Sequence, residues 1–443
     1  MKKLFYIKTY GCQMNFYDSE KIQDLLKPMG YILSKEPENC DLAILNTCHI
    51  REKASEKMYS DIGRLSKYKK NKKLAGENMI IAICGCVAQA EGKEIIKRNK
   101  DVDIVLGPHN YHKLTSILSK KLTRPVIKNE FDVEEKFNSF PKPSFSGVTA
   151  FVSIQEGCDK FCTFCVVPYT RGAEYSRNVL DIFVEVKNLV SLGVKEITLL
   201  GQNVNAYNGK FDFQNPKNLY SLAKLCSFLS EIKGLERIRY ITSHPADMTD
   251  ELILEHQNNS KLMPYLHLPI QSGSNKILKE MNRRYTKEAY LKIVEKLRSK
   301  RPNIALTSDF IVGFPGENKS DFDDTMDIVK SVKFAGSYSF KYSPRPGTPA
   351  FLKKFDLEDN IINDRLNILQ KELNLQQKQF NEKCIGLDME VLIEKIGKKR
   401  NQFVGRSEYL QPVHIISGEN LIGKLVKVKI KSLTSFSLHG KLS

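Results

Sequence analysis

Three cysteines lie within eight residues of the sequence, in the stretch QEGCDKFCTFCVVPYTRG. They are Cys158, Cys162 and Cys165, spaced C-x3-C-x2-C, and no fourth cysteine is near them. A structural zinc site is closed by four ligands, and a four-iron cluster is normally held by four thiolates. Three thiolates around such a cluster leave one iron open to bind a substrate or cofactor. Zinc completed by a distant His or Asp is an alternative on this spacing.

The same loop follows the first strand of a predicted partial barrel, and there it resembles the signature of the radical S-adenosylmethionine superfamily. That resemblance implies that S-adenosylmethionine chelates the open iron through its amino and carboxylate groups. Electron transfer from the cluster would then cleave the sulfonium and yield a 5′-deoxyadenosyl radical.

A second set of cysteines occurs where predicted strands of the N-terminal segment end. Cys12 follows one strand, Cys48 follows another, and Cys84 and Cys86 end a third. Because the carboxyl ends of parallel strands meet at one edge of a sheet, three thiolates could converge there. Buried free cysteine is common, so spacing alone also allows a structural role. We interpret Cys40, Cys226 and Cys384 as structural.

The elements that must position these cysteines form three segments. Residues 1–123 alternate apolar strands with helical periods, which predicts a parallel α/β domain; the strands are expected at 4–9, 41–48, 79–86 and 103–107. Residues 124–148 carry Pro, Ser and charge without sustained periodicity, and we interpret them as a linker.

Residues 149–375 repeat strand and helix about six times, which predicts a partial (β/α)6 barrel with ligands at the strand carboxyl ends. The strands are expected at 150–155, 196–203, 237–243, 265–271, 305–313 and 337–343. A long helix at 357–382 leads to residues 376–443, where short strands and turns predict a small β-barrel. This barrel is basic and carries aromatic residues, which fits an RNA-binding module.

The amino-acid composition indicates what kind of partner the protein could bind. The formal net charge is +18, from 69 basic and 51 acidic residues. Such a surface suits a polyanion such as nucleic acid, although a lysine-rich bias would give the same balance. Ten cysteines in clusters indicate metal ligation rather than disulfides, and with no secretory signal or long apolar run we expect a cytoplasmic protein that does not span a membrane.

Motifs along the whole chain resemble the methylthiotransferase family, and most closely its tRNA-modifying branch. Beside the cysteine loop, the matching stretches are YGCQMNFYDSE (10–20), NTCHIREKA (46–54), GCVAQ (85–89), GQNVNAY (201–207), TSHP (242–245), HLPIQSGS (267–274), DFIVGFPGE (309–317) and YSPRPGTPA (342–350). The resemblance implies an N-terminal methylthiotransferase domain, a radical S-adenosylmethionine core and a C-terminal TRAM domain.

The resemblance also implies an activity and its cofactors. The reaction would methylthiolate carbon 2 of N6-dimethylallyladenosine at position 37 of tRNAs that read codons beginning with U. S-adenosylmethionine would be methyl donor and radical source. Two 4Fe–4S clusters are implied, one on Cys158, Cys162 and Cys165 and an auxiliary one on Cys12, Cys48 and Cys86, which leaves Cys84 as an extra cysteine. The implied partners are the tRNA anticodon loop, an electron donor and a sulfur source, and we expect a monomer.

Polar and small residues at the barrel strand ends are candidate contacts for S-adenosylmethionine or substrate. Glycine permits close backbone approach, and the amide and hydroxyl side chains can donate or accept hydrogen bonds; turn and cap roles are the alternative. The set is Gly201, Gln202, Asn203, Ser243 and Gln271. Arg171, after the cysteine loop, or Arg345, in SPRPG, could hold a tRNA phosphate.

Other functions stay open on the sequence. Related branches act on threonylcarbamoyl-adenosine in tRNA or on an aspartate of a ribosomal protein, with the same clusters and chemistry. CQMN and GQNVNAY resemble the dimethylallyladenosine branch best. A different class is a non-catalytic iron–sulfur or zinc RNA-binding protein.

Overall fold

The computed structural model describes residues 3–49, 52–144, 147–211, 218–354 and 357–443. The chain forms two compact units, each treated by itself below. Unit 1 comprises Met1–Phe145, Gln155–Asp159 and Cys165–Arg177, and unit 2 comprises Ser146–Ile154, Lys160–Phe164 and Asn178–Ser443. The cysteine loop is therefore divided between the units.

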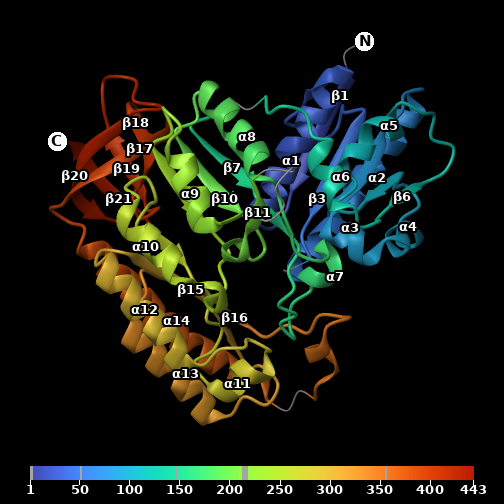
Figure 1. Cartoon of the computed structure of the whole chain (residues 1–443). Helices are drawn as coiled ribbons and strands as arrows, with labels where there is room; N and C mark the ends of the chain where they lie inside the picture. The colour runs from blue at the N-terminus through green and yellow to red at the C-terminus, as the bar shows by residue number, and fades with distance from the viewer. Residues whose placement is uncertain (1–2, 50–51, 145–146, 212–217, 355–356) are drawn as a thin grey trace. The chain divides into compact units, whose positions relative to one another are not determined.

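Unit 1 is built on a parallel sheet in the order β2-β1-β3-β4-β5-β6 (Figure 1). Its central strand β3 is buried along its whole length, as parallel strands covered on both faces are. The predicted strands are confirmed, and β2 and β6 are additions to them. The strands are β1 (Lys3–Thr9), β2 (Tyr31–Leu33), β3 (Leu42–Thr47), β4 (Ile80–Gly85), β5 (Ile104–Leu106) and β6 (Val126–Lys128).

Apolar side chains from the two faces of this sheet pack into two separate cores, which the surrounding helices complete. The helices are α1 (Gln13–Leu26), α2 (Glu52–Leu74), α3 (Cys86–Glu91), α4 (Lys93–Arg98), α5 (Leu114–Leu118) and α6 (Val133–Asn138). Both β6 and α6 come from the predicted linker. Residues 126–128 pair with β5, so this part of the segment belongs to the sheet.

The central part of unit 2 carries two three-stranded parallel sheets, β13-β10-β7 and β14-β15-β16. A parallel bridge between Ile238 and Leu262 joins them, which gives the predicted partial barrel. The strands are β7 (Thr149–Ser153), β10 (Glu196–Leu200), β13 (Arg237–Tyr240), β14 (Tyr265–His267), β15 (Ala305–Val312) and β16 (Gly336–Lys341). The six strands fall where the sequence predicts them.

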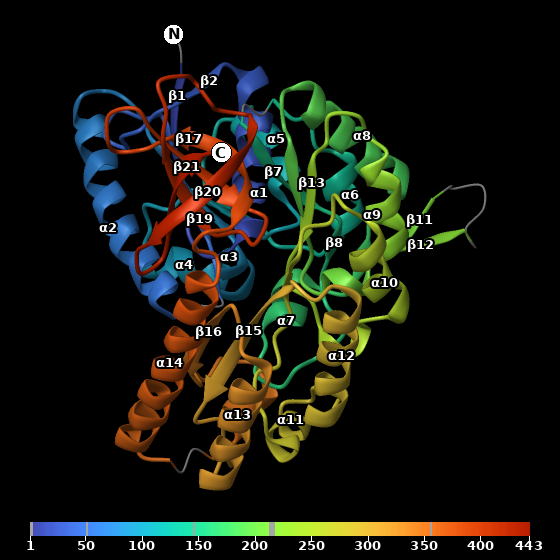
Figure 2. The same ribbon diagram turned by 90° about the vertical axis from the view of Figure 1, so that its left-hand side faces the viewer.

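Helices follow these strands in the α/β alternation, and α12, α13 and α14 lie beside the β14-β15-β16 sheet (Figure 2). The helices are α8 (Val179–Ser191), α9 (Leu222–Ser230), α10 (Asp250–Asn258), α11 (Asn275–Glu280), α12 (Lys287–Lys300), α13 (Lys319–Val332) and α14 (Asp359–Glu382). A small hairpin pairs β11 (Asn208–Lys210) with β12 (Leu219–Ser221). Within the described ranges, no helix is both long and apolar enough to cross a membrane.

The C-terminal strands close into the predicted small barrel, in the order β17-β18-β19-β21-β20. Inward Val428 and Ile430 alternate with outward lysines along β20, as a two-residue strand period requires, and Met389 and Val391 alternate with outward Asp388 and Glu390 at the start of β17. The strands are β17 (Asp388–Ile396), β18 (Gln402–Ser407), β19 (Pro412–Ile416), β20 (Leu425–Leu433) and β21 (Leu438–Leu442).

Two buried arginines of β13 fasten this small barrel to the partial barrel. Arg237 donates to the carbonyls of Arg406 and Glu390, at 3.0 and 2.8 Å. Arg239 donates to the carbonyls of Glu408 and Ser407, and its Nε lies 3.0 Å from Glu196. Backbone carbonyls of the small barrel therefore accept hydrogen bonds from two guanidinium groups that are buried on the partial barrel.

Replacing Arg239 with methionine should loosen the small barrel. The substitution removes two hydrogen bonds to the small barrel and one to Glu196, and among the described contacts it leaves buried Glu196 with Arg237 at 3.7 Å as its ion-pair partner. Breaking a buried pair costs about 3–5 kcal/mol, so limited proteolysis should release a C-terminal fragment much faster than from the unsubstituted chain. Arg406→Met is the matched control because that side chain is partly exposed. Equal cleavage of both variants would contradict the anchoring role.

Candidate iron–sulfur sites

Three cysteines of unit 1 lie at the carboxyl ends of three adjacent strands. Cys12 follows β1 and is the N-cap of α1, Cys48 follows β3, and Cys86 opens α3 directly after β4. Because β1, β3 and β4 are neighbours, the sheet places these thiols along one edge. Cys84 lies two residues earlier, within β4, and is fully buried in the apolar core.

Two glycines allow close backbone approach at these strand ends, Gly11 against Cys48 and Gly85 against Thr47. Gly11 has φ +100°, and a Cβ there would lie 2.1 Å from the Cys48 Cβ and 2.7 Å from its Sγ. Gly85 has φ +92°, and a Cβ there would lie 2.4 Å from the Thr47 carbonyl. Only glycine fits this combination of positive φ and close approach. The Gly11 contact therefore lets the end of β1 lie directly against Cys48.

The thiols differ in their ease of ionisation. A hydrogen bond with Cys48 lowers the pKa of Cys12 to about 6, against the opposing effect of burial, and the charge of Arg171 lowers it further. Burial raises the pKa of Cys86, although Arg171 offsets part of that effect. Thiolate is the metal-ligating form, so a nearby cation suits these residues to bind iron.

The thiols are not gathered around a single point. Among the residues that the structure describes, no group of three His, Cys, Asp or Glu side chains is close enough to hold one metal ion. A four-iron cluster offers a separate iron to each thiolate, so its ligands do not need to converge on one atom. Three thiols at neighbouring strand ends beside a guanidinium are suited to such a cluster.

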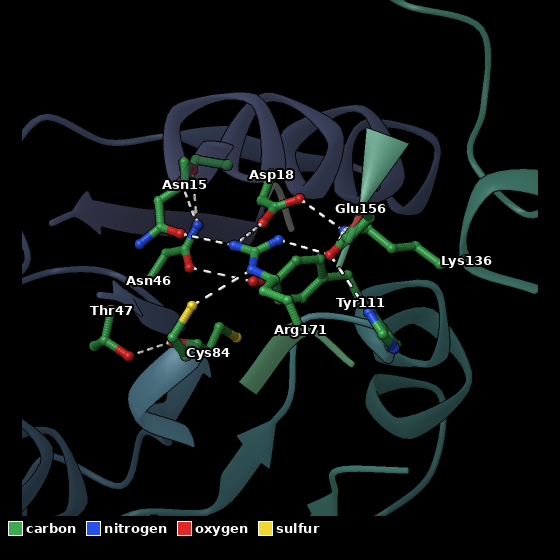
Figure 3. Close-up of polar contacts among 12 residues, drawn as sticks. Asn15, Asp18, Asn46, Thr47, Cys84, Tyr111, Lys136, Glu156 and Arg171 are labelled. Atoms are coloured by element: carbon green, nitrogen blue, oxygen red, sulfur yellow. Dashed lines mark hydrogen bonds and ion pairs between the residues drawn. The ribbon is translucent and has the colours of Figure 1, made fainter. Parts of the chain in front are cut away.

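A buried ion network surrounds Arg171 (Figure 3). The Arg171 guanidinium donates to Glu156 at 2.7 Å, to Asp18 at 2.9 Å and to the Asn15 side chain at 3.0 Å. Lys136 bridges the same two carboxylates, at 3.0 Å from Asp18 and 2.7 Å from Glu156. Although burial alone would raise it, the pKa of Glu156 is held well below its usual value by Lys136 and Arg171.

This network changes the interpretation of Arg171. Only 2% of its surface is exposed, and its nitrogens are engaged by Asp18, Glu156, Asn15 and the Cys86 sulfur. The predicted phosphate contact was wrong, because a guanidinium enclosed in this way has no open face for a nucleic acid.

The cysteine loop is braced on its unit 1 side by a short hairpin. β8 (Gln155–Glu156) pairs with β9 (Tyr175–Ser176), and the Cys158 amide donates to the Gly172 carbonyl at 3.2 Å. Helix α7 (Val167–Arg171) begins two residues after Cys165 and ends at Arg171. Cys158 and Cys165 are partly exposed.

Cys162 belongs to unit 2 and is buried there. Arg283 donates from Nη1 to the Cys162 sulfur at 3.4 Å and from Nη2 to the Pro269 carbonyl at 2.7 Å. Asn282 donates to the carbonyls of Lys160 and Phe161, which fixes the loop backbone. Phe161 has φ +49°, an unfavourable value for a bulky residue that surrounding contacts must hold.

The predicted strand-end contacts lie on the partial barrel of unit 2. Gly201 is buried after β10, and buried Asn203 donates to Asp247 at 2.8 Å. Ser243 is buried, and its hydroxyl has no hydrogen-bond partner among the described residues. Gln271 has φ +77° and bridges to Phe310. Gln202 is half-buried.

Several residues of these sites had no recognisable signal in the sequence. Lys136 lies in the segment interpreted as a linker; Asp18 and Glu156 lie in matched stretches, but nothing in those stretches marks them as partners of Arg171. Arg283 lies in MNRRYT, outside the motifs that we matched. Each acts through a contact with a residue far away in the chain, so no local spacing could have revealed it.

Family models match three regions in the order of the predicted segments. Residues 4–107 match an uncharacterized protein family, UPF0004; residues 152–329 match the radical SAM superfamily; and residues 382–443 match the TRAM domain. Fold and site together define a radical S-adenosylmethionine protein with a TRAM domain.

Curated relatives match over the full length. Proteins named tRNA-2-methylthio-N(6)-dimethylallyladenosine synthase from Rickettsia canadensis and Rickettsia akari are 52% and 53% identical to this chain, and each match covers all of both sequences. The chain therefore belongs to the family of tRNA-2-methylthio-N(6)-dimethylallyladenosine synthases.

Solved structures share the fold at low identity. TsrM from Kitasatospora setae, a radical S-adenosylmethionine methyltransferase, aligns with a TM-score of 0.56 and 12% identity, over 80% of this chain and 75% of that one. OxsB, a cobalamin-dependent S-adenosylmethionine radical enzyme, aligns with a TM-score of 0.53 and 13% identity, over 86% and 56%. These likenesses support the fold class.

Replacing Gly11 with alanine should impair the strand-end cysteines selectively. The new Cβ would overlap Cys48, so the reconstituted chain should hold about four irons in place of about eight, by cluster arithmetic. Iron and sulfide analysis measures this. Gly76→Ala is the matched control, since Gly76 has φ +78° and open space around it. Equal iron in both variants would show that Gly11 does not shape the site.

Proposed function

We propose that this chain methylthiolates carbon 2 of N6-dimethylallyladenosine in tRNA, next to the anticodon, with S-adenosylmethionine as methyl donor and radical source. The observation that carries the proposal is 52–53% identity over the whole length to synthases of that name. The cysteines at the carboxyl ends of β1, β3 and β4 support it, because a second iron–sulfur site distinguishes this chemistry from a generic radical enzyme.

Cys158, Cys162 and Cys165 would hold one 4Fe–4S cluster, and Cys12, Cys48 and Cys86 would hold the other. When bound, the clusters supply an electron to cleave S-adenosylmethionine and a site for the sulfur that is transferred. The chain's own part is to prepare the thiols for iron: the pKa of Cys12 is low, Arg171 offsets part of the rise that burial causes in the pKa of Cys86, and Arg283 donates a hydrogen bond to the Cys162 sulfur.

The buried strand ends of the partial barrel are the proposed contacts for S-adenosylmethionine. Gly201 admits close backbone approach, and the Ser243 hydroxyl is buried and unpartnered among the described residues. Gln271 is held in a left-handed conformation that costs free energy, as ligand-binding residues often are. Gln202 and Asn203 complete the proposed set.

The C-terminal barrel is the proposed RNA-binding surface. Lys427, Lys429 and Lys431 alternate outward along β20, and Lys441 pairs across the sheet with Lys429. Phe436 nearby is 73% exposed and is available to stack on a base. Lysines of this kind bind phosphates without sequence preference, so the affinity for tRNA should fall steeply with salt.

The remaining partners follow from the chemistry. Reductive cleavage needs an external electron donor, and each turnover consumes sulfur that must be resupplied. We propose that the protein works as a monomer in the cytoplasm, where tRNA and reduced thiols are available.

Nucleoside mass spectrometry of tRNA from a strain lacking the gene, with and without a plasmid copy, tests the proposal. We expect 2-methylthio-N6-dimethylallyladenosine to disappear on deletion, to be replaced by its unmethylthiolated precursor, and to return with the plasmid. If that nucleoside persists while the threonylcarbamoyl derivative or a ribosomal-protein aspartate loses its methylthio group, a related branch is the correct assignment.

A further inference from the structure

Each set of cysteines includes one sulfur that receives an N–H from a buried arginine. In unit 1, Arg171 Nε lies 3.4 Å from the Cys86 sulfur. In unit 2, Arg283 Nη1 lies 3.4 Å from the Cys162 sulfur. The two arginines are 2% and 5% exposed, so neither is a surface cation that happens to lie near a thiol.

Two neighbouring carboxylates compensate the positive charge of Arg171. Asp18 and Glu156 accept from its Nη atoms, and Lys136 shares both carboxylates. These two cations and two carboxylates, all nearly or fully buried, balance one another in charge, and the buried His109 imidazole lies 3.4 Å from Glu156 as a further contact of the network. Arg171 therefore offers Cys86 a directed hydrogen bond without a net positive field.

The charge of Arg283 meets no carboxylate in its described contacts. Its Nε donates to the Tyr285 hydroxyl at 2.8 Å, and its Nη2 donates to the Pro269 carbonyl. His244 packs edge-on against Tyr285, and burial lowers the pKa of His244 to about 2, so it is neutral. Within the described contacts, this guanidinium faces the Cys162 sulfur and no carboxylate.

We propose that Arg171 and Arg283 are positioning residues that each hold one cluster-ligand sulfur, and that they poise the two clusters differently. Arg283 places an uncompensated positive charge beside Cys162. At Cys86, Asp18 and Glu156 compensate the positive charge of Arg171. Hydrogen bonds to sulfur and net charge set the reduction potential of iron–sulfur clusters. The positive site should accept an electron more readily than it would without Arg283.

This inference rests on the proposed function, because it requires both cysteine sets to hold clusters. The test uses the reconstituted full chain, with Cys12, Cys48 and Cys86 replaced by alanine to observe one cluster and Cys158, Cys162 and Cys165 replaced to observe the other. Redox titration followed by electron paramagnetic resonance then measures each midpoint potential. A chain with no iron in either background would overturn the proposed function itself.

Arg283→Met should lower the midpoint potential at the Cys162 site. Loss of one charge-assisted hydrogen bond should shift the reduction equilibrium about tenfold, which is about 59 mV for one electron. Arg283→Lys keeps the charge and should recover most of the shift, which also covers the case in which the methionine variant folds poorly. Arg365→Met is the control, because buried Arg365 pairs with Glu317. An unchanged potential in both Arg283 variants with iron retained overturns the proposal.

The charge compensation at Cys86 has its own test. Arg171→Met combined with Glu156→Gln leaves Lys136 opposite Asp18 and keeps the network neutral. This pair should shift the potential of the auxiliary site less than Arg283→Met shifts the other, while the resonance line shape changes because the bond to sulfur is lost. A shift as large as that of Arg283→Met would overturn the proposed difference between the sites.

Discussion

Replacing Cys162 with alanine will abolish reductive cleavage of S-adenosylmethionine, and replacing Cys86 will not. Cys162 is the buried cysteine of the C-x3-C-x2-C loop and receives a hydrogen bond from Arg283. Formation of 5′-deoxyadenosine should fall by roughly a thousandfold or more, the scale of removing one member of a catalytic unit. The Cys86 variant should still form 5′-deoxyadenosine but should yield no methylthiolated tRNA.

Two buried cysteines without a proposed ligand role serve as controls. Cys226 in α9 matches Cys162, and Cys84 at the end of β4 matches Cys86; both are fully buried. Their alanine variants should keep both products, measured by liquid chromatography and mass spectrometry. Normal cleavage in the Cys162 variant, or normal methylthiolation in the Cys86 variant, would refute the ligand assignment.

Replacing Lys136 with methionine should destabilise the sheet of unit 1 strongly. Lys136, Asp18 and Glu156 are fully buried, and Lys136 neutralises one of the two carboxylates. Its removal leaves Arg171 as the one lysine or arginine among the described contacts of the two carboxylates, beside the His109 imidazole at 3.4 Å from Glu156, and an uncompensated buried charge costs about 3–5 kcal/mol. Hydrogen–deuterium exchange of β3 and β4 amides in the full chain reports the loss, because these central strands exchange through the largest openings.

A second substitution distinguishes charge balance from packing. Lys136→Met with Glu156→Gln restores neutrality and should recover a large part of the lost protection. Lys128→Met on β6 removes a partly exposed lysine that pairs with Glu130 at 3.5 Å, and should cost between nothing and about 1 kcal/mol. If the double variant exchanges as fast as Lys136→Met alone, the methylene packing of Lys136 outweighs its charge.

The strand pattern explains how much of the fold could be predicted. Fully buried strands such as β3 and β4 read as continuous apolar runs, and the helices between them carry a helical period. The short strands β2 and β6 were missed because three residues give no periodicity and their neighbours are polar. The Pro- and charge-rich composition of residues 124–148 also concealed α6.

Within the sites, the sequence by itself determined which cysteines could ligate iron. The C-x3-C-x2-C spacing is local, and the strand-end positions of Cys12, Cys48 and Cys86 follow from parallel topology. Which charged residues lie beside these cysteines was decided by the tertiary structure alone. Lys136 meets Asp18 across 118 residues, Arg171 meets Asp18 across 153, and Arg283 meets Cys162 across 121. A lysine or arginine in a polar stretch resembles a surface residue until packing removes its water and leaves a carboxylate or a sulfur as its partner.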